Sequence, residues 1–376
     1  MFDEATIDTY RDRISDAVDG ARAELDEALA DARQLVGRFH TLRPRAQQMV
    51  SLASDGGHSR IEVNPFNLFV VRVVDSNGNE IMSGVVAPHE DTRELSRQQF
   101  DAVGEPITAI GVLMRDLGVA KISELTPMIK DEPDSNGWVI VYRDLCEWAA
   151  LYERLVYDTP TASTVYVKDG LLRTKIFRDD LLIQIGSRVN AAIEHWWQER
   201  RVRVSLAGVA KHSEIAEYYR LAFAVVGGLP PGYPLWTDIP LDVQRKVYTW
   251  PEYVREPDDV RPGIEDPKFN IGAMHFVRFG PGEGDRLWTV DVLHHQRHHF
   301  EEVVSALVAD AQDGFPIAHY PLSLQRADEF AQVAGFDREL LTELMKDEIR
   351  SRLPEGRGFV LDAMQLDVDV TARRYG

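Results

Sequence analysis

Two short apolar runs in this chain lead directly into an aspartate that is followed by glycine, and they constrain the fold more than any other feature. The runs are SLAS before Asp55 and STVYVK before Asp169. Such runs predict buried strands, and glycine permits a tight turn where a strand ends. We therefore expect Asp55 to end a first strand and Asp169 to end a later one. A single Asp-Gly pair is a common turn, whereas two that each end a buried strand indicate a shared site.

The segments between these aspartates predict an RNase H-like α/β fold, that is, a mixed sheet flanked by helices. The runs LFVVRVVD and EIMSGVVA flank the turn residues at positions 76–79, which predicts a β-hairpin. The segment DLCEWAALYERLVY then predicts a helix. In a fold with this order of elements the first and the later strand lie side by side, so Asp55 and Asp169 are expected to face one crevice.

Carboxylates in one crevice predict a metal site. They repel each other unless a divalent cation neutralises them, and oxygen ligands favour Mg²⁺ or Mn²⁺. A third acid is expected from the intervening helix, where Glu147 and Glu153 are the candidates. Glu147 is favoured because it lies near the start of the apolar run of that helix. Glu153 also suits the solvated face of an amphipathic helix, so both alternatives stay open.

The N-terminal segment predicts one long helix, from Ile7 to Phe39, in which apolar residues recur every seven positions. Its alanines suit close packing either on the body of the protein or on a second copy of the chain, and both alternatives stay open. We expect residues 1–44 to form a helical arm and residues 45–376 to form one elaborated α/β domain, since no repeat or clear linker interrupts it.

The charge of the chain excludes a general nucleic-acid coat protein. The formal net charge is −19 at pH 7, whereas such proteins carry an excess of Lys and Arg that neutralises phosphates. Any contact with nucleic acid is therefore expected to be local. Two groups of basic residues could supply it, although a solvated surface is the more common explanation for each group alone. They are Lys168, Arg173, Lys175 and Arg178 in one, and Arg200, Arg201 and Arg203 in the other.

Other patterns limit the remaining classes of function. No apolar stretch of about 18 residues is present to span a bilayer, and the N-terminal residues lack the pattern of a signal peptide, so we expect a cytoplasmic protein with no membrane partner. Cys146 is the only cysteine, which excludes a disulfide framework and a thiolate zinc cluster. Neither a phosphate-binding P-loop nor a G-x-S-x-G motif occurs, so we expect no ATP hydrolysis by the chain itself.

A histidine run, LHHQRHHFEE, resembles a metal site at first sight. It places His294 with His298, and His295 with His299, at helical spacing. It lacks the glutamate of H-E-x-x-H, and nothing nearby supplies an obvious third ligand. A solvated or phosphate-facing helix is therefore favoured over zinc catalysis.

A late segment, from Tyr320 to Asp328, reads YPLSLQRAD. Together with the early Asp-Gly motif, the helical glutamate and the second Asp-Gly motif, it resembles the NurA family of nucleases, whose late segment is Y-P-x-x-L-x-x-A-H. Asp328 stands where that family usually has His, and Gly57 stands where its early D-G-[ST] motif has Ser or Thr. The segments LAGVAKHS and MHFVRF…RLWTVDV also resemble strands of the family, so the resemblance runs from about Ala46 to about Gly335.

The resemblance implies a metal-dependent DNA nuclease that hydrolyses phosphodiester bonds with two Mn²⁺ or Mg²⁺ ions. It implies 5′-to-3′ exonuclease activity on the ends of double-stranded and single-stranded DNA, and some single-strand endonuclease activity. It also implies a homodimer and a HerA-like hexameric ATPase as partner, in end processing or defence. The ligands that it implies are Asp55, Glu147, Asp169 and Asp328.

For two more residues the sequence leaves two possible roles open. Lys211 follows a predicted strand and could approach a phosphate, or it could be a surface lysine at a helix start. Tyr320 could contact a base or a phosphate, or it could fill the core. A rival function is a catalytically weakened DNA-end clamp or adaptor for the ATPase, suggested by the changed residues Gly57 and Asp328 and by the acidic charge.

Overall fold

The computed structural model describes most of the chain, and these residues form two compact units. It describes residues 3–42, 49–248, 250, 253, 269–333, 335–354, 357–358 and 361. Unit 1 comprises Met1–Ser51, Ala162–Thr174 and Ser205–Leu322, and unit 2 comprises Leu52–Thr161, Lys175–Val204 and Ser323–Gly376. The expected boundary after Pro44 lies outside the described residues, so that division stays a prediction. Among the described residues, no helix combines the length and hydropathy that a bilayer span requires.

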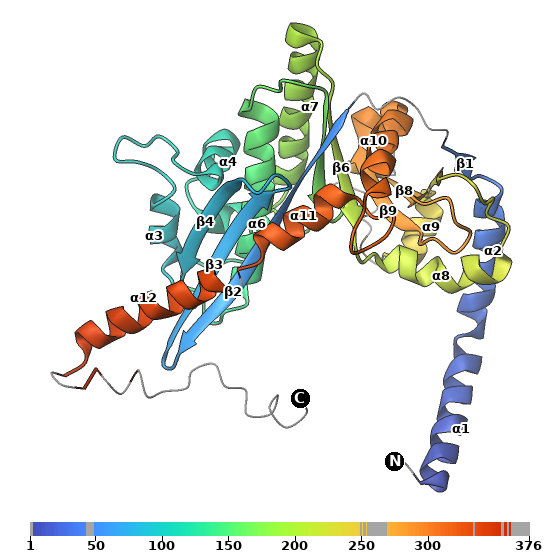
Figure 1. Cartoon of the computed structure of the whole chain (residues 1–376), viewed down its shortest axis with the longest axis horizontal. Helices are drawn as coiled ribbons and strands as arrows, with labels where there is room; N and C mark the ends of the chain where they lie inside the picture. Colours follow the sequence, from blue (N-terminus) through green and yellow to red (C-terminus); the bar gives the residue numbers. More distant parts are fainter. Residues whose placement is uncertain are drawn as a thin grey trace. The chain divides into compact units, whose positions relative to one another are not determined.

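Unit 2 is built on three antiparallel strands that follow one another in the chain and in the sheet (Figure 1). They are β2 (Val50–Val63), which begins with the last residues of unit 1, β3 (Phe66–Asp75) and β4 (Glu80–Val86). The predicted hairpin between β3 and β4 is confirmed. Its turn is held by Asp75, whose carboxylate accepts hydrogen bonds from the backbone amides of Asn77 and Asn79 at 2.8 and 3.0 Å.

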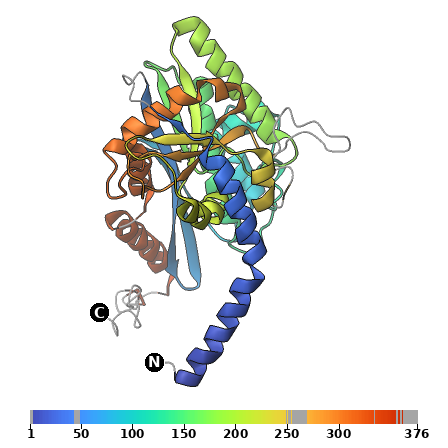
Figure 2. The ribbon, with the colours of Figure 1, turned by 90° about the vertical axis from the view of Figure 1, so that its right-hand side faces the viewer.

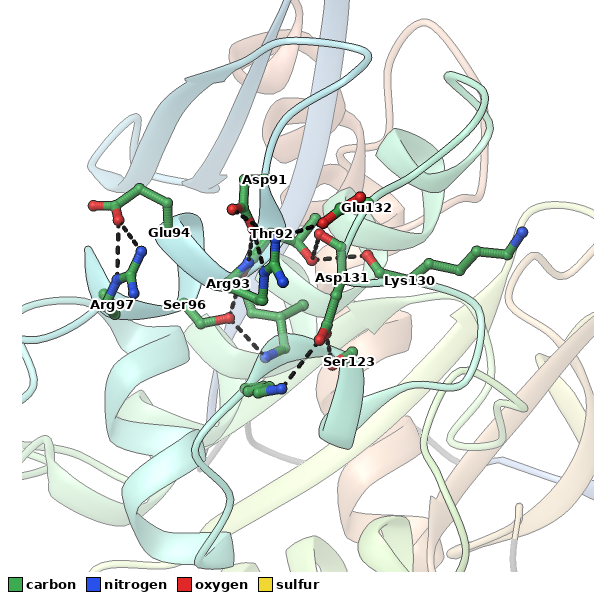
Figure 3. Close-up of polar contacts among 12 residues, drawn as sticks. Asp91, Thr92, Arg93, Glu94, Ser96, Arg97, Ser123, Lys130, Asp131 and Glu132 are labelled. Carbon is green, nitrogen blue, oxygen red and sulfur yellow. Dashed lines mark hydrogen bonds and ion pairs between the residues drawn. The ribbon is translucent and has the colours of Figure 1, made fainter.

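Helices surround these strands. They are α3 (Thr92–Arg97), α4 (Ala109–Leu117), α5 (Ile122–Leu125), α6 (Trp138–Tyr157), α7 (Leu181–Arg200), α11 (Leu322–Ala331) and α12 (Phe336–Arg352). The predicted helix α6 contacts α4, α7 and β3. A polar network joins the α3 segment to the loop after α5 (Figure 3). In it Arg93 contacts Glu132 at 2.6 Å, and Ser123 donates to Asp131 at 2.5 Å.

Unit 1 contains the remaining strands, in the sheet order β1-β7-β8-β9-β6-β5. Their bounds are β1 (His40–Thr41), β5 (Thr164–Asp169), β6 (Val204–Ala210), β7 (Leu235–Asp238), β8 (Gly272–Arg278) and β9 (Trp288–Leu293). The late hairpin is confirmed as β8 and β9, which pair antiparallel. Helix α7 connects β5 to its neighbour β6, a connection typical of parallel strands. The predicted α/β class, with a strand, a hairpin, a helix and a later strand in that order, is confirmed.

The predicted single N-terminal helix is two consecutive helices, α1 (Glu4–Gly20) and α2 (Arg22–Val36). They meet at Ala21, whose ψ of 0° departs from the helical value directly after a glycine. The small residues Ala28 and Ala32 of α2 are buried in a core that also contains Phe223 of helix α8 (Glu214–Val226). The arm therefore packs on its own unit through α2, and α1 extends beyond it (Figure 1, Figure 2).

The remaining helices of unit 1 are α9, η2 and α10. Their bounds are α9 (Leu241–Val247), η2 (His294–His299) and α10 (Phe300–Gln312). Helix α9 contributes Val243 to the core that α2 and α8 share. Because α10 follows η2 and β9 without a break, the histidine run lies between a strand and a helix of unit 1.

The prediction that Asp55 ends the first strand is wrong. Strand β2 continues to Val63, and Asp55 and Gly56 pair with Val74 and Val73 of β3. Neither Gly56 nor Gly57 has a positive φ, so no turn requires them. They are required by close packing instead: a Cβ at Gly56 would lie 2.6 Å from Cγ of Glu147, and a Cβ at Gly57 would lie 2.0 Å from the carbonyl oxygen of Ala331.

A side chain at position 57 should therefore separate α11 from β2. We expect Gly57→Ala to lower the free energy of unfolding by about 1–3 kcal/mol, because the backbone of α11 must move to admit one methyl group. Gly84→Ala is the matched control, since a Cβ at Gly84 in β4 would meet nothing within 4 Å. Urea denaturation of both variants measures the difference. Equal unfolding midpoints would show that this contact does not fix α11.

Candidate metal centre

Two of the predicted metal ligands, Asp55 and Asp328, come together within unit 2. Each offers a carboxylate oxygen, and these oxygens lie within 4.8 Å of each other. Strand alternation places Asp55 on the same face of β2 as Gly57, the face that Ala331 of α11 covers. Asp328 lies one helical turn before Ala331 in that helix. The close packing of α11 on Gly57 therefore brings the two carboxylates together.

The pair is shielded from solvent on the strand side. Asp55 is only 8% exposed, and its Oδ1 accepts a hydrogen bond from the Gly56 amide at 2.8 Å. Two carboxylates at this separation repel each other strongly when both are ionised, and burial weakens the screening by water. Hard oxygen donors at this spacing fit a Mg²⁺ or Mn²⁺ ion, which would offset the repulsion. The donor set thus fits the metal predicted from the sequence.

Glu147 is the buried one of the two helical candidates. It is 5% exposed, and it fills the space that Gly56 leaves on the face of β2 opposite to the Asp55 side chain. Its Oε1 lies 3.4 Å from Nε of Arg143, one turn earlier in α6. Among the described residues, Glu147 does not join Asp55 and Asp328 at the 4.8 Å ligand distance. Its role as a ligand stays a prediction.

Glu153 is half-buried. Burial raises the pKa of its carboxyl, and the nearby carboxylate of Asp158 adds to that rise. It lies further along α6 than the residues packed on Gly56, so the geometry favours Glu147.

In unit 1, Asp169 is the last residue of β5, as predicted. Gly170 follows with a φ of +106°, a conformation that favours glycine, so the expected turn is present. The turn is fixed on β6, because the Gly170 amide donates to the carbonyl oxygen of Val209 at 2.9 Å. Gly208 permits this approach, since a Cβ there would lie 2.4 Å from the carbonyl oxygen of Gly170.

Lys211 lies just after β6 and is bound to this acid. Its Nζ contacts Oδ2 of Asp169 at 2.8 Å, and its side chain is 26% exposed. The ammonium group therefore lies beside a predicted ligand and still reaches solvent. This ion pair does not fit an isolated surface lysine, and the alternative that Lys211 approaches a phosphate stays a prediction.

Tyr320 occupies a core position. It is fully buried, and its ring centroid lies 4.4 Å from that of Trp288. An enclosed ring has no open face for a base, so the base-stacking alternative is wrong and the core alternative holds.

Two residues of the first basic group, Lys168 and Arg173, are buried and present no charge to solvent. Arg173 is buried and forms an ion pair with Asp291 at 2.9 Å, so it stabilises unit 1 instead. Lys168 is also buried and donates to the carbonyl oxygen of Asp169 at 2.8 Å. Arg178 donates to the carbonyl oxygen of Ser123 at 3.0 Å. In the second group, Arg201 and Arg203 lie over the ring of Trp197, at 5.4 and 5.3 Å from its centroid.

The histidine run does not form the predicted α-helical pairs. Its residues form the 3-10 helix η2, in which residues three apart align rather than residues four apart. Among the described residues, no group of three potential metal ligands contains a histidine. His294 instead turns inward, and its Nε2 is buried without a hydrogen-bond partner in the described part of the chain. Burial lowers the pKa of His294 to about 4, although the Asp291 carboxylate opposes this shift.

This buried imidazole should make the stability of the protein depend on pH. The pKa of His294 is about 4 in the folded state and about 6.5 in an unfolded chain. Between these values the unfolded state binds more protons, so the free energy of unfolding should fall by about 2–3 kcal/mol as the pH is lowered from about 6.5 to about 4. His294→Gln should reduce this loss, whereas His295→Gln, at the exposed neighbouring position, should leave it unchanged. Denaturant titrations across this pH range measure both. The same pH dependence in wild type and His294→Gln would contradict the assignment.

Comparisons with known proteins complete the description of the site. The sequence matches no family model and no curated protein. Similar solved structures include the NurA nuclease from Sulfolobus solfataricus, with a TM-score of 0.47, 12% identity and coverage of 94% of this chain and 99% of that one. A NurA bound to dAMP and manganese has a TM-score of 0.43 and 9% identity, with coverage of 96% and 100%. An endonuclease V from Streptomyces avermitilis has a TM-score of 0.25 and 14% identity, with coverage of 85% and 94%. Since all three TM-scores are below 0.5, the case for a function rests on the residues of this chain.

Proposed function

We propose that this protein is a divalent-metal-dependent DNA nuclease that binds its metal through Asp55 and Asp328, with Asp169 as a further ligand on the ground of its Asp-Gly motif in the sequence. The observation that carries the proposal is the pair of carboxylates, Asp55 and Asp328, with oxygens within 4.8 Å of each other in unit 2. Bringing two anions together costs free energy, and a bound cation recovers it. Two Mn²⁺ or Mg²⁺ ions at such a centre would activate the attacking water and stabilise the leaving oxygen of a phosphodiester.

The residues of the chain have separate roles in this proposal. Asp55 and Asp328 hold the metal from β2 and α11, and Asp169 is proposed as a ligand from the sequence motifs alone. Lys211, which contacts Asp169 at 2.8 Å, is proposed to bind a phosphate oxygen through its ammonium group. Glu147 is proposed as a further ligand or as the group that supports Asp55 from the opposite face of β2, which its buried position against Gly56 favours over Glu153.

The proposed substrate and partners are those that the resemblance of the sequence motifs to the NurA family implies. We propose cleavage of DNA ends in the 5′-to-3′ direction and of single strands, in the cytoplasm, together with a HerA-like hexameric ATPase. A homodimer is supported by α1, where Ile7, Ile14 and Val18 are 44, 62 and 64% exposed. Apolar residues at such spacing on an exposed helix suit pairing with a second helix.

A DNA-end clamp or ATPase adaptor remains the second candidate, and two changed residues suggested it. Gly57 is explained by the contact of α11 with β2, which leaves no room for a serine side chain. Asp328 supplies a carboxylate where the resembling family has an imidazole, and a carboxylate is a good ligand for Mg²⁺. Both changes are thus compatible with catalysis. Mn²⁺ binding by the wild-type protein without cleavage of any DNA end would favour the clamp.

The nuclease proposal predicts which acids are essential. We expect Asp55→Asn, Asp328→Asn and Asp169→Asn each to lower Mn²⁺-dependent cleavage by at least about 100-fold, because each change removes a ligand charge. We expect Glu147→Gln to have a comparable effect. Glu153→Gln removes the same charge from the same helix, so it is the matched control. Its cleavage rate should stay within a few-fold of that of the wild type.

End-labelled single-stranded and double-stranded DNA, with Mn²⁺, Mg²⁺ or EDTA, provides the assay. Circular dichroism shows whether each variant is folded. Wild-type rates in folded Asp55→Asn and Asp328→Asn would refute the site. Loss of activity in Glu153→Gln but not in Glu147→Gln would move the helical role to Glu153.

The homodimer is tested through the exposed face of α1. We expect Ile14→Glu combined with Val18→Glu to convert a dimer into a monomer, because a carboxylate in an apolar helix seam must lose its water on association. Deletion of the whole arm is less informative, since Ala28 and Ala32 of α2 belong to the core of unit 1. Val103→Glu, at a position 83% exposed in unit 2, is the control. Light scattering that shows a wild-type monomer at micromolar concentrations would contradict the dimer.

A further inference from the structure

Beside the acids of unit 2 lies one arginine whose side chain is only partly engaged. Arg143 is in α6, one turn before Glu147, and its Nη2 contacts Oδ1 of Asp144 at 2.5 Å. Its Nε lies 3.4 Å from Oε1 of Glu147, and within the described part of the chain this Nε has no hydrogen-bond partner. A guanidinium has five N–H donors in a rigid fork. Because Nε is buried beside Glu147, the donors that can meet a further acceptor are those of the two Nη atoms.

The position of Arg143 relates it to the candidate metal centre. Its side chain is 29% exposed and that of Glu147 is 6% exposed, so Arg143 forms the solvent-facing end of this cluster. The charge of Asp55 also acts on it, together with those of Glu147 and Asp144. Arg143 is therefore a solvent-facing cation beside Glu147 whose charge also interacts with that of Asp55.

A second arginine near Asp55 is differently placed. Arg72 of β3 pairs with Gly57 in the sheet register. Its Nε contacts Glu80 at 3.0 Å and its Nη1 contacts Asp337 at 3.1 Å. Two carboxylates from different elements thus hold Arg72, whereas the contact of Arg143 at hydrogen-bond distance is with its own chain neighbour.

An anionic strand that approaches Asp55 and Asp328 meets a strongly unfavourable field, because the chain carries a net charge of −19. A planar guanidinium is the side chain that best matches two oxygens of one phosphate. His58, three residues after Asp55 on β2, is exposed and lies close enough to Arg143 and Asp144 for their charges to act on it. Its imidazole ring adds a further N–H donor at the same surface.

We propose that Arg143, flanked by His58, is a phosphate-binding site that holds a backbone phosphate of the substrate strand beside Glu147, on the face of β2 that Gly56 and His58 share. The site takes a phosphodiester through the Nη donors of the guanidinium. It would hold DNA whether or not a metal is bound, and it would fix the strand next to Glu147. The inference rests on the proposed function for its substrate.

The test measures DNA binding in EDTA, so that no cleavage is needed. Fluorescence anisotropy with short end-labelled single strands and duplexes, over a series of NaCl concentrations, gives the affinity and its salt dependence. We expect Arg143→Gln to weaken binding about tenfold at low salt. We expect it also to reduce the slope of log affinity against log salt by about 0.9 for a duplex, the value for one phosphate contact. Arg143→Lys keeps the charge and loses the fork, so it should preserve the slope and weaken binding by only a few-fold.

Arg97→Gln is the matched control, since Arg97 is an exposed arginine of unit 2 that contacts Glu94 (Figure 3). It should leave both quantities unchanged. Titration of Mn²⁺ without DNA provides a separate readout. The affinity should not fall in Arg143→Gln, because removal of a nearby positive charge favours cation binding, whereas loss of an arginine that only orients Glu147 as a ligand would lower it.

The outcomes separate this inference from the proposed function. A wild-type slope in folded Arg143→Gln overturns the inference, even if the protein cleaves DNA. A reduced slope in a protein that binds DNA but cleaves none supports the inference and refutes the nuclease. If Arg143→Gln does not fold, Arg143→Lys decides, because unchanged duplex affinity in that variant excludes recognition through the fork. A wild-type protein that binds no DNA overturns both.

Discussion

The repulsion between two carboxylates whose oxygens lie within 4.8 Å of each other is the constraint on which the candidate site depends. Asp55 lies within a paired strand and Asp328 lies in a helix, so neither backbone can move away easily. The helix cannot retreat without losing the contact of Ala331 with Gly57, and the strand cannot turn without breaking its pairing with β3. The fold therefore keeps two anions close together, and a divalent cation is the simplest partner that stabilises such an arrangement.

The glycines next to Asp55 show how much of this could be predicted from the sequence. The order of strand, hairpin, helix and strand follows from local patterns of apolar residues, and these patterns were sufficient for the fold class and for the position of Asp169. The same local reasoning placed a turn after Asp55, because glycine in an Asp-Gly pair usually serves a turn. Here glycine provides space, for Glu147 on one face and for Ala331 on the other, and both partners are distant in the sequence.

Two other misreadings have the same physical origin. Arg173 resembles a phosphate contact in the sequence because its partner, Asp291, is 118 residues away. Burial of that pair turns an apparent surface charge into an internal cross-link between β9 and the segment after β5. The histidine run matched α-helical spacing, but the residues follow directly after β9 and form a tighter 3-10 helix, which changes the faces that the side chains share. A spacing of four residues therefore predicts which side chains share a face only where the segment forms an α-helix.

The cations near the predicted acids indicate where a metal belongs. Asp169 has Lys211 at 2.8 Å, and Glu147 has Arg143 at 3.4 Å, so each of these acids has a basic side chain of its own unit beside it. Asp55 and Asp328 have each other's carboxylate within 4.8 Å, and the charge of Arg143 also acts on Asp55. A divalent ion that binds between these two carboxylates relieves their repulsion. Once such an ion neutralises the acids, the basic residues beside them can contact the phosphates of a bound strand.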